Sequence, residues 1–255
     1  MTYQELKKNS EPIASTARIE VLQLDGIAYK LFNKSYSRYH AYREAMLQCM
    51  AADAGINVPT IHGVIEVDDR LAILSDYIEG DTVANLMEQF PAKKDKYLSL
   101  LADTQLGLLS RTAHDVRKLT HCLEQDIRAL TQLDEVKRYE LETLLASMPD
   151  HDRLCHGNFG PENVMIDGMD KVFILDWDAA ARGNAGADMA KTYLKMTLTS
   201  TEDAEKYIRL LCEKTGYDRQ YIYEWVPVMA ASCLNEKGFS EKEKEALLTW
   251  IDVEK

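Results

Sequence analysis

The sequence is short of basic residues and of long apolar runs, and each shortage argues against a class of protein. Its 30 lysine and arginine residues face 42 aspartate and glutamate residues, which gives a formal net charge of −12 at pH 7. A dedicated nucleic-acid binder needs clustered positive charge to contact phosphates. No stretch reaches the ~20 consecutive apolar residues of a membrane helix, and the first residues lack an apolar signal-peptide core. We therefore expect a cytoplasmic protein with no nucleic-acid or membrane partner.

Cysteine is also scarce. The five cysteines are odd in number and include no Cys-x-x-Cys pair, so neither a zinc motif nor a redox motif is indicated, and we expect reduced thiols. Hydrophobic residues make up 46% of the chain and charged residues 28%, which is ordinary globular usage. The 255 residues suit two modest lobes, because single cores stop growing near ~250–300 residues.

Strand patterns dominate the beginning of the chain. Two runs, residues 19–24 and 27–32, flank an Asp25-Gly26 pair, which predicts a hairpin because glycine adopts positive φ at little cost. The remaining elements predicted here are a helix from Ser35 or Ser37 to Ala54 and two strands at residues 61–67 and 71–77.

Helical periodicity dominates from Thr82 onwards. The predicted helices cover residues 82–90, 95–113, 119–131, 134–147, 185–198, 202–215, 219–235 and 240–252. We expect an α+β protein with a small β-rich lobe at residues 1–79, which contains one helix, and a larger, mainly helical lobe at residues 80–255.

A polar island interrupts the helices at residues 154–178, LCHGNFGPENVMIDGMDKVFILDWD. Its two apolar runs, NVMI and KVFIL, flank a turn and predict a hairpin. This hairpin would hold Asn163 at its entrance and Asp176 at its exit, so that their oxygen atoms converge. Hard oxygen ligands of this kind are what Mg²⁺ prefers, with phosphates and waters completing the shell.

The pattern H-G-x-x-x-x-x-N followed by I-L-D-W resembles the catalytic loop and metal-binding strand of aminoglycoside phosphotransferases and choline kinases, which have a protein-kinase-like fold. The resemblance implies that Lys30 contacts ATP phosphates, with Glu44 as its ion-pair partner, and that Asn163 and Asp176 hold Mg²⁺. It also implies that Asp188 supports the loops. His156 is interpreted as a structural residue that braces the catalytic loop.

In phosphoryl transfer the protein mainly positions the reactants and neutralises charge, and the lysine, asparagine and aspartate named above can do both. The nucleotide is expected to be ATP or GTP. The turn that would cover it, residues 12–18, contains none of the glycines that are frequent there in the family. Close approach to phosphates is easiest at glycine, so modest affinity is expected, with Ser15 and Thr16 donating hydroxyl hydrogen bonds.

A second departure concerns the acceptor. The family usually has aspartate after His-Gly, whereas this chain has Asn158. An amide orients a hydroxyl but cannot take its proton at neutral pH, and loss of a general base typically costs ~10²–10⁴-fold in rate. Two functions therefore stay open. One is an ATP- and Mg²⁺-dependent phosphotransferase that acts on a hydroxyl of a small molecule, and the other is a pseudokinase that binds a nucleotide or acts as a scaffold without turnover.

The acceptor class is indicated only in outline. Few residues separate Asp176 from the helix predicted at Ala185, which leaves little room to hold a peptide and favours a small molecule. The late helices are rich in acidic and aromatic residues, which favours a cationic acceptor such as an aminoglycoside or a choline-like amine. The sequence does not indicate an oligomeric state.

Overall fold

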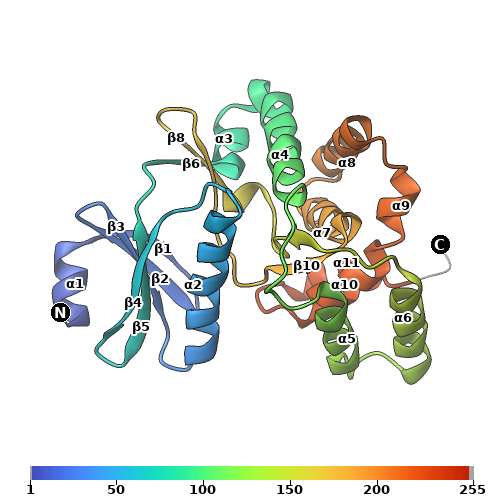
Figure 1. Cartoon of the computed structure of the whole chain (residues 1–255), viewed down its shortest axis with the longest axis horizontal. Coiled ribbons are helices and arrows are strands. Elements are labelled where there is room, and N and C mark those ends of the chain that lie inside the picture. The colour runs from blue at the N-terminus through green and yellow to red at the C-terminus, as the bar shows by residue number, and fades with distance from the viewer. Residues whose placement is uncertain (1, 253–255) are drawn as a thin grey trace. The chain divides into compact units, whose positions relative to one another are not determined.

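The structure is a computed structural model that describes residues 2–252, and it divides into two compact units (Figure 1). The first unit comprises Met1–Asn85 and Glu162–Ala179, and the second comprises Leu86–Pro161 and Ala180–Lys255. Most strands lie in the first unit and most helices in the second, which confirms the predicted α+β class. The predicted lobes at residues 1–79 and 80–255 were divided where strand patterns give way to helical periodicity, and this division stays a prediction. By compactness, the hairpin after Asn163 belongs with the first unit.

The first unit is built on an antiparallel five-stranded sheet with the strand order β1-β2-β3-β5-β4. Its strands are β1 (Glu11–Ser15), β2 (Ile19–Leu24), β3 (Ile27–Phe32), β4 (Ile61–Val67) and β5 (Arg70–Asp76). The predicted hairpin at Asp25-Gly26 is confirmed, because both residues have positive φ, 51° and 78°, as a type I′ turn requires.

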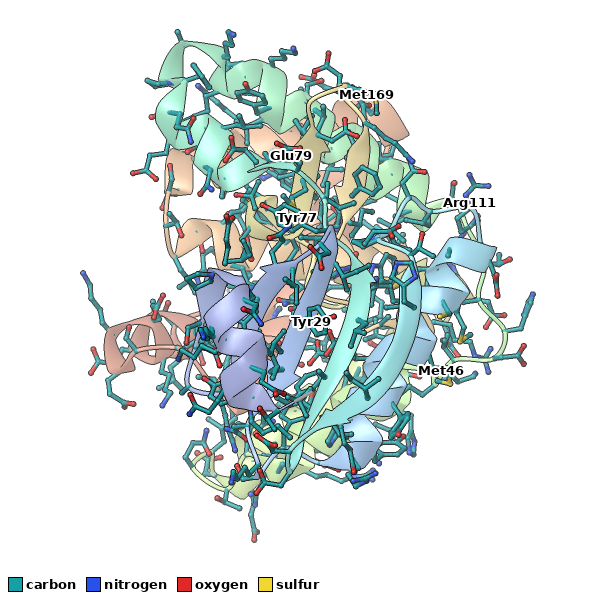
Figure 2. All side chains as sticks on the ribbon, turned by 90° about the vertical axis from the view of Figure 1, so that its left-hand side faces the viewer. Tyr29, Met46, Tyr77, Glu79, Arg111 and Met169 are labelled. Carbon is teal, nitrogen blue, oxygen red and sulfur yellow. The ribbon has the colours of Figure 1, made fainter. Side chains whose placement is uncertain are left out.

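Helices cover both faces of this sheet (Figure 1). Successive residues of β3 point to opposite faces, so Leu31 packs with Leu6 of α1 (Tyr3–Asn9), whereas Phe32 packs with Ala41 of α2 (Arg38–Asp53). Tyr29, labelled in Figure 2, lies on the α1 face. On the opposite face α2 packs against β4 and β5.

The N-terminal segment corrects the sequence interpretation. Residues 12–18 were predicted to be a turn, but the first four of them continue strand β1, and only Thr16–Arg18 turn the chain. Helix α1 was not predicted, although Thr2 and Glu5 form a capping box at its start. The Thr-x-x-Glu signal was therefore present in the sequence.

A small antiparallel sheet holds the hairpin of the polar island. It has the order β6-β8-β9, from β6 (Gly80–Thr82), β8 (Val164–Asp167) and β9 (Val172–Ile174), which confirms the predicted hairpin. Strands β6 and β8 approach so closely that a Cβ atom on Gly80 would lie 2.2 Å from the carbonyl oxygen of Ile166.

We expect Gly80→Ala to lower the free energy of unfolding by about 1–3 kcal/mol, because the added methyl group meets backbone that cannot move aside locally. Chemical denaturation measures the change. The control is Gly63→Ala in β4, where a Cβ atom would meet nothing within 4 Å. Equal effects of the two substitutions would show that β6 and β8 separate at little cost.

The second unit is mainly helical. Its elements are α4 (Lys94–Leu109), α5 (Leu119–Ala129), α6 (Glu135–Ser147), β7 (Arg153–Cys155), β10 (Ala181–Gly183), α7 (Ala185–Thr197), α8 (Thr201–Thr215), α9 (Arg219–Tyr223), α10 (Val226–Asn235) and α11 (Glu241–Leu248). Helix α3 (Val83–Gln89) crosses the boundary between the units, and short 3₁₀ turns lie at Pro91–Lys93 and Pro161–Asn163. Helix α7 is buried over most of its length and packs against α8 and α10.

Two features of this unit bear on the predictions. The helix predicted at residues 219–235 is broken into α9 and α10, and Pro227 lies in the first turn of α10, where its missing N–H has no helical partner to lose. Within residues 2–252, no helix combines the length and the apolar character needed to cross a bilayer.

Candidate active site

A charged triad lies in the first unit at the end of β9. The ammonium of Lys30, on β3, forms an ion pair with Glu44 of α2 and lies 2.7 Å from Oδ1 of Asp176. The Glu44 side chain is only 4% exposed, so this charge is held almost out of water. The contact between Lys30 and Glu44 that the family resemblance implied is therefore present, and the proposed metal ligand Asp176 joins it.

In this triad one ammonium, that of Lys30, forms ion pairs with two carboxylates. Burial alone would lower the pKa of Lys30, but the carboxylates of Glu44 and Asp176 raise it. Burial raises the pKa of Glu44 to about 7, and repulsion from Asp176 adds to this effect while Lys30 opposes it. Because the ammonium cannot fully compensate both carboxylates, Glu44 holds a proton more readily than an exposed glutamate does.

This raised pKa predicts how stability depends on pH. The pKa of Glu44 in the folded state, about 7, lies above the ordinary glutamate value of 4.5. Between these two values the folded state binds the extra proton, so stability falls as the pH rises. The free energy of unfolding of the wild type, relative to Glu44→Gln, is expected to fall by about 2 kcal/mol between about pH 5.5 and pH 7. Denaturant titrations at several pH values measure this difference.

The control for this prediction is Glu79→Gln, at an exposed glutamate that is labelled in Figure 2. The free energy of unfolding of this variant should change with pH in the same way as that of the wild type. If the free energy of unfolding of Glu44→Gln also changes with pH as that of the wild type does, Glu44 is ionised throughout this range. That result would contradict the electrostatic account of the triad.

The proposed metal ligands lie at the two ends of the β8–β9 hairpin. The backbone N–H of Leu175 donates to the carbonyl oxygen of Asn163 at 2.8 Å. Asp176 is the next residue after Leu175, so this hydrogen bond keeps the backbone of Asp176 near that of Asn163. Asp176 has a φ of 66°, a left-handed conformation that aspartate tolerates better than most residues. Arg43 of α2 donates to the carbonyl oxygen of Asp178, which ties the segment after Asp176 to the helix that carries Glu44.

This donor set fits Mg²⁺. An amide and a carboxylate supply two hard oxygen ligands, and Mg²⁺ usually takes one or two protein ligands and completes its shell with waters and substrate phosphates. Within residues 2–252, no group of three or more histidine, cysteine, aspartate or glutamate residues is arranged to hold a metal on its own. Asn163 and Asp176 would suit a metal that arrives with a nucleotide.

The turn that is predicted to cover the nucleotide begins where β1 ends. Ala14 of β1 pairs with Val21 of β2, and Val21 pairs with Lys30 of β3. Ser15 is therefore the residue that follows the position of β1 in line with Lys30. The Thr16 hydroxyl oxygen accepts from the N–H groups of Arg18 and Ile19, both at 3.2 Å. These bonds use the lone pairs of the Thr16 oxygen and leave its proton as a donor.

The loop at His156 is braced from inside the second unit. The buried ring of His156 accepts the N–H of Asn158 at Nδ1, at 3.2 Å. Asp188 of α7 is 2% exposed, and its two oxygens accept from the N–H of Gly157 at 2.7 Å and from the amide of Gln105 at 3.0 Å. These bonds fix the loop from both sides.

Sequence reasoning missed two residues that support this loop, Gln105 through Asp188 and Lys195 directly. Gln105, on α4, binds Asp188 and also accepts the hydroxyl of Tyr207. Lys195, on α7, donates its ammonium to Oδ1 of Asn158. A signal for Lys195 existed, because it follows Asp188 by seven residues and thus lies on the same helix face.

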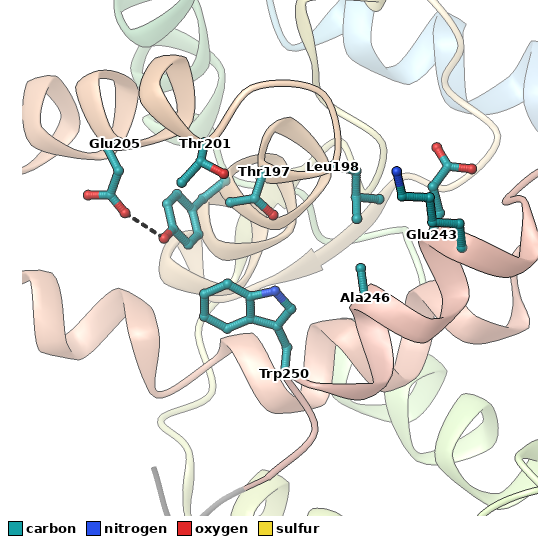
Figure 3. A pocket seen from close by; sticks show the side chains of 9 residues that line it. Thr197, Leu198, Thr201, Glu205, Glu243, Ala246 and Trp250 are labelled. Carbon is teal, nitrogen blue, oxygen red and sulfur yellow. Dashed lines mark hydrogen bonds between the residues drawn. The ribbon is translucent and has the colours of Figure 1, made fainter.

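A cavity of about 370 Å³ lies between α7, α8, α11 and Trp250, which follows α11 (Figure 3). Tyr193 and Trp250 form part of its lining and meet edge to face, with ring centroids 6.2 Å apart. Glu205 accepts the Tyr193 hydroxyl at 2.8 Å and also pairs with Arg219. Partial burial alone would raise the pKa of Glu205, but these hydrogen bonds hold it below the usual value, so the cavity contains an ionised carboxylate.

The family model described as the phosphotransferase enzyme family matches residues 28–223, which include the charged triad, the loop at His156 and most of the cavity. The chain belongs to the phosphotransferase enzyme family. A comparison of the chain with curated protein sequences gives no match.

Three solved structures share the fold of this chain. Aminoglycoside-3′-phosphotransferase of type VIII is 16% identical with a TM-score of 0.67, over 88% of this chain and 94% of that one. A thermostable mutant of aminoglycoside phosphotransferase APH(4)-Ia, in a ternary complex with AMP-PNP and hygromycin B, is 14% identical with a TM-score of 0.69, over 95% and 91%. Choline kinase LicA from Streptococcus pneumoniae is 14% identical with a TM-score of 0.63, over 97% and 94%. The predicted protein-kinase-like fold is thereby confirmed.

The structure groups most of the predicted site residues in two sets. Lys30, Glu44 and Asp176 meet in the first unit, where Asn163 lies at the other end of the same hairpin. The second set, in the second unit, consists of His156, Asn158 and Asp188. Their roles in binding and catalysis stay predictions.

Proposed function

We propose that this protein transfers the γ-phosphoryl group of ATP, in the presence of Mg²⁺, to a hydroxyl group of a small molecule. The observation that carries the proposal is the triad, in which Lys30 is held between Glu44 and Asp176. Such an arrangement fixes a cation beside a carboxylate, which is what binding of a metal-bound triphosphate requires. ATP is preferred to GTP because the APH(4)-Ia relative was crystallised with AMP-PNP.

The residues of the first unit would bind the nucleotide. Lys30 would contact the phosphates and Glu44 would hold the ammonium in place. Asn163 and Asp176 would hold Mg²⁺, which when bound neutralises the charge that develops on the phosphates. Ser15 and Thr16 would donate hydroxyl hydrogen bonds from the covering turn. Residues 1–79 are thus proposed as the nucleotide-binding lobe.

Residues 80–255 are proposed as the catalytic and acceptor-binding lobe. Asn158 would orient the acceptor, while His156 and Asp188 hold its loop. The cavity lined by Tyr193 and Trp250 would hold the rest of the acceptor, and its ionised Glu205 favours a cationic group such as the amine of an aminoglycoside- or choline-like molecule. The free cysteines agree with a cytoplasmic location.

Asn158 also favours a second candidate, a pseudokinase that binds nucleotide without turnover. An Asn158→Asp variant separates the two functions, with release of ADP in the presence of MgATP and a panel of alcohols and amino alcohols as the readout. We expect an acceptor-dependent rate in the wild type, and an increase of about 10²–10⁴-fold in the variant because the carboxylate can take the hydroxyl proton.

The other outcomes decide against parts of this proposal. A rate that appears only in Asn158→Asp would support the pseudokinase. Equal rates in the two proteins would mean that proton transfer does not limit turnover. Absence of MgATP binding in the wild type would contradict nucleotide-dependent function of either kind.

A further inference from the structure

Helix α2 has an apolar outer side that is exposed. Tyr39, Tyr42 and Met46 have exposed fractions of 67%, 50% and 49%, and the exposed Cys49 continues their row. Steps of three, four and three residues separate these side chains, and this spacing places them in one stripe along the helix. Met46 is labelled in Figure 2. A surface helix normally carries charged and polar residues on its outer side, so these four residues, the α2 stripe, indicate a contact surface.

The sheet of the first unit cannot cover the α2 stripe. Ala41 and Ala45, on the opposite side of the helix, already pack with Phe32 of the sheet. Glu44 is also directed inward, because it is 3% exposed and forms an ion pair with Lys30. Helix α2 therefore joins the sheet with one side and presents a second apolar side to the outside.

The charges at the two ends of α2 are the reverse of what the helix dipole favours. Arg38 is the first residue of the helix and Asp53 is the last, whereas a helix favours acidic residues at its beginning and basic residues at its end. Helix α8 follows that rule, with Asp203 in its first turn and Lys214 in its last. Arg38 pairs with Glu66, but both side chains are exposed, so this ion pair contributes little. Helix α2 by itself therefore gains nothing from this placement of charge.

We propose that two copies of this chain associate through the α2 stripe, with their α2 helices side by side and antiparallel. In that orientation the spacing is self-complementary, because Tyr39 of one copy faces Cys49 of the other and the two inner positions face each other likewise. The Asp53 end of each helix then lies beside the Arg38 end of the other, so both charges meet a partner of opposite sign. Because each copy contributes the same surface, the contact closes as a two-fold dimer.

The size of the stripe sets the strength of the dimer. Helix α2 has 16 residues and is thus about 24 Å long. Two stripes of this length bury less than the ~800 Å² per partner of a standard interface, so we expect a weak dimer with a Kd on the order of 10–100 μM. Sedimentation velocity of the wild type at concentrations below, within and above this range measures the dimer directly.

Tyr42→Glu tests whether the stripe forms the contact. The substitution places a carboxylate from each copy in the contact without a partner, so the dimer should weaken at least about 100-fold. The control is Tyr139→Glu, which makes the same change at an exposed tyrosine of α6 and should leave the dimer unaltered. Glutamate is a good helix former at exposed positions, and circular dichroism checks that both variants keep their helix content.

Disulfide formation tests the orientation of the two helices. In Tyr39→Cys, the new thiol should bond to Cys49 of the other copy under mild oxidation and give a covalent dimer. The two positions lie about 15 Å apart along one helix, so this disulfide cannot form within a single chain. The double variant Tyr39→Cys/Cys49→Ser should give no covalent dimer. Peptide mapping by mass spectrometry identifies the bond.

Charge reversal tests the ends of the helices. Arg38→Glu and Asp53→Lys should each weaken the dimer about 10-fold, since each variant turns two attractive contacts into repulsive ones. The double variant should recover the affinity of the wild type, because the antiparallel pair then has the same attractions with the signs exchanged. A parallel pair would gain no such rescue.

Three results would overturn the inference. A wild type that stays monomeric up to about 1 mM would leave the α2 stripe to a different partner. A dimer that is equally strong in Tyr42→Glu would lie on another face of the chain. A disulfide between the two Cys49 residues of a wild-type dimer would show that the helices run parallel.

Discussion

Replacing Asp188 by alanine is expected to lower the free energy of unfolding by about 3–5 kcal/mol, because the substitution leaves buried partners unpaired. The N–H of Gly157 and the amide of Gln105 both lose their acceptor inside the second unit. For a chain of this size the change corresponds to a fall of about 6–20 °C in Tm. Denaturant and thermal unfolding measure it directly.

Asp103→Ala is the matched control for this prediction. Asp103 is an aspartate of the same unit, but it is 60% exposed and pairs with Lys214 at the surface, where ion pairs contribute little. We expect a change of less than about 1 kcal/mol for this variant. If Asp188→Ala is as stable as Asp103→Ala, then Asp188 does not hold the loop at His156, and the account of that loop is wrong.

Replacing Asp176 by asparagine is expected to weaken MgATP binding by about 10–100-fold or more, because loss of a residue that merely orients a metal ligand already costs that much. The substitution preserves the shape of the side chain and is compatible with the left-handed backbone at this position. It also removes one of the two carboxylates that pair with Lys30. Isothermal titration calorimetry with and without Mg²⁺ measures the effect.

The hairpin offers a closely matched control. Asp170 lies in the β8–β9 turn, is exposed and has a φ of 61°, close to the 66° of Asp176. Asp170→Asn therefore makes the same chemical change in the same backbone conformation, and it should leave MgATP binding unaltered. Comparable affinities in Asp170→Asn and Asp176→Asn would show that Asp176 is no metal ligand.

The elements that local chemistry specifies could be predicted from the sequence. Asp25-Gly26 encodes a type I′ turn in two residues, and the strands on either side run to the predicted residues. The island hairpin was predictable for the same reason, because turn residues separate two short apolar runs. The pairing of Lys30 with Glu44 came from the family resemblance, since nothing local connects a strand lysine to a helix glutamate 14 residues later.

Long-range contacts were beyond such reasoning. Gln105 binds Asp188 across 83 residues, so this contact leaves no signature in any window of sequence. The contact of Lys195 with Asn158, across 37 residues, is signalled only by the helix face that Lys195 shares with Asp188. The break between α9 and α10 was also missed, because the apolar periodicity continues through Pro227. Strand β1 was read as a turn, because its five residues are exposed and show no alternation of buried and exposed positions.

The most direct test of the central claim is a thermal-shift titration of the wild type with ATP and with GTP, each with and without Mg²⁺. It requires no knowledge of the acceptor. At about one hundred times Kd, ligand binding stabilises a protein by about 2.7 kcal/mol, which corresponds to a rise of roughly 5–11 °C in Tm for this chain length. We predict a rise of this size with ATP that depends on Mg²⁺. Absence of any shift at millimolar nucleotide would contradict the assignment of Lys30, Asn163 and Asp176 to a phosphate and metal site.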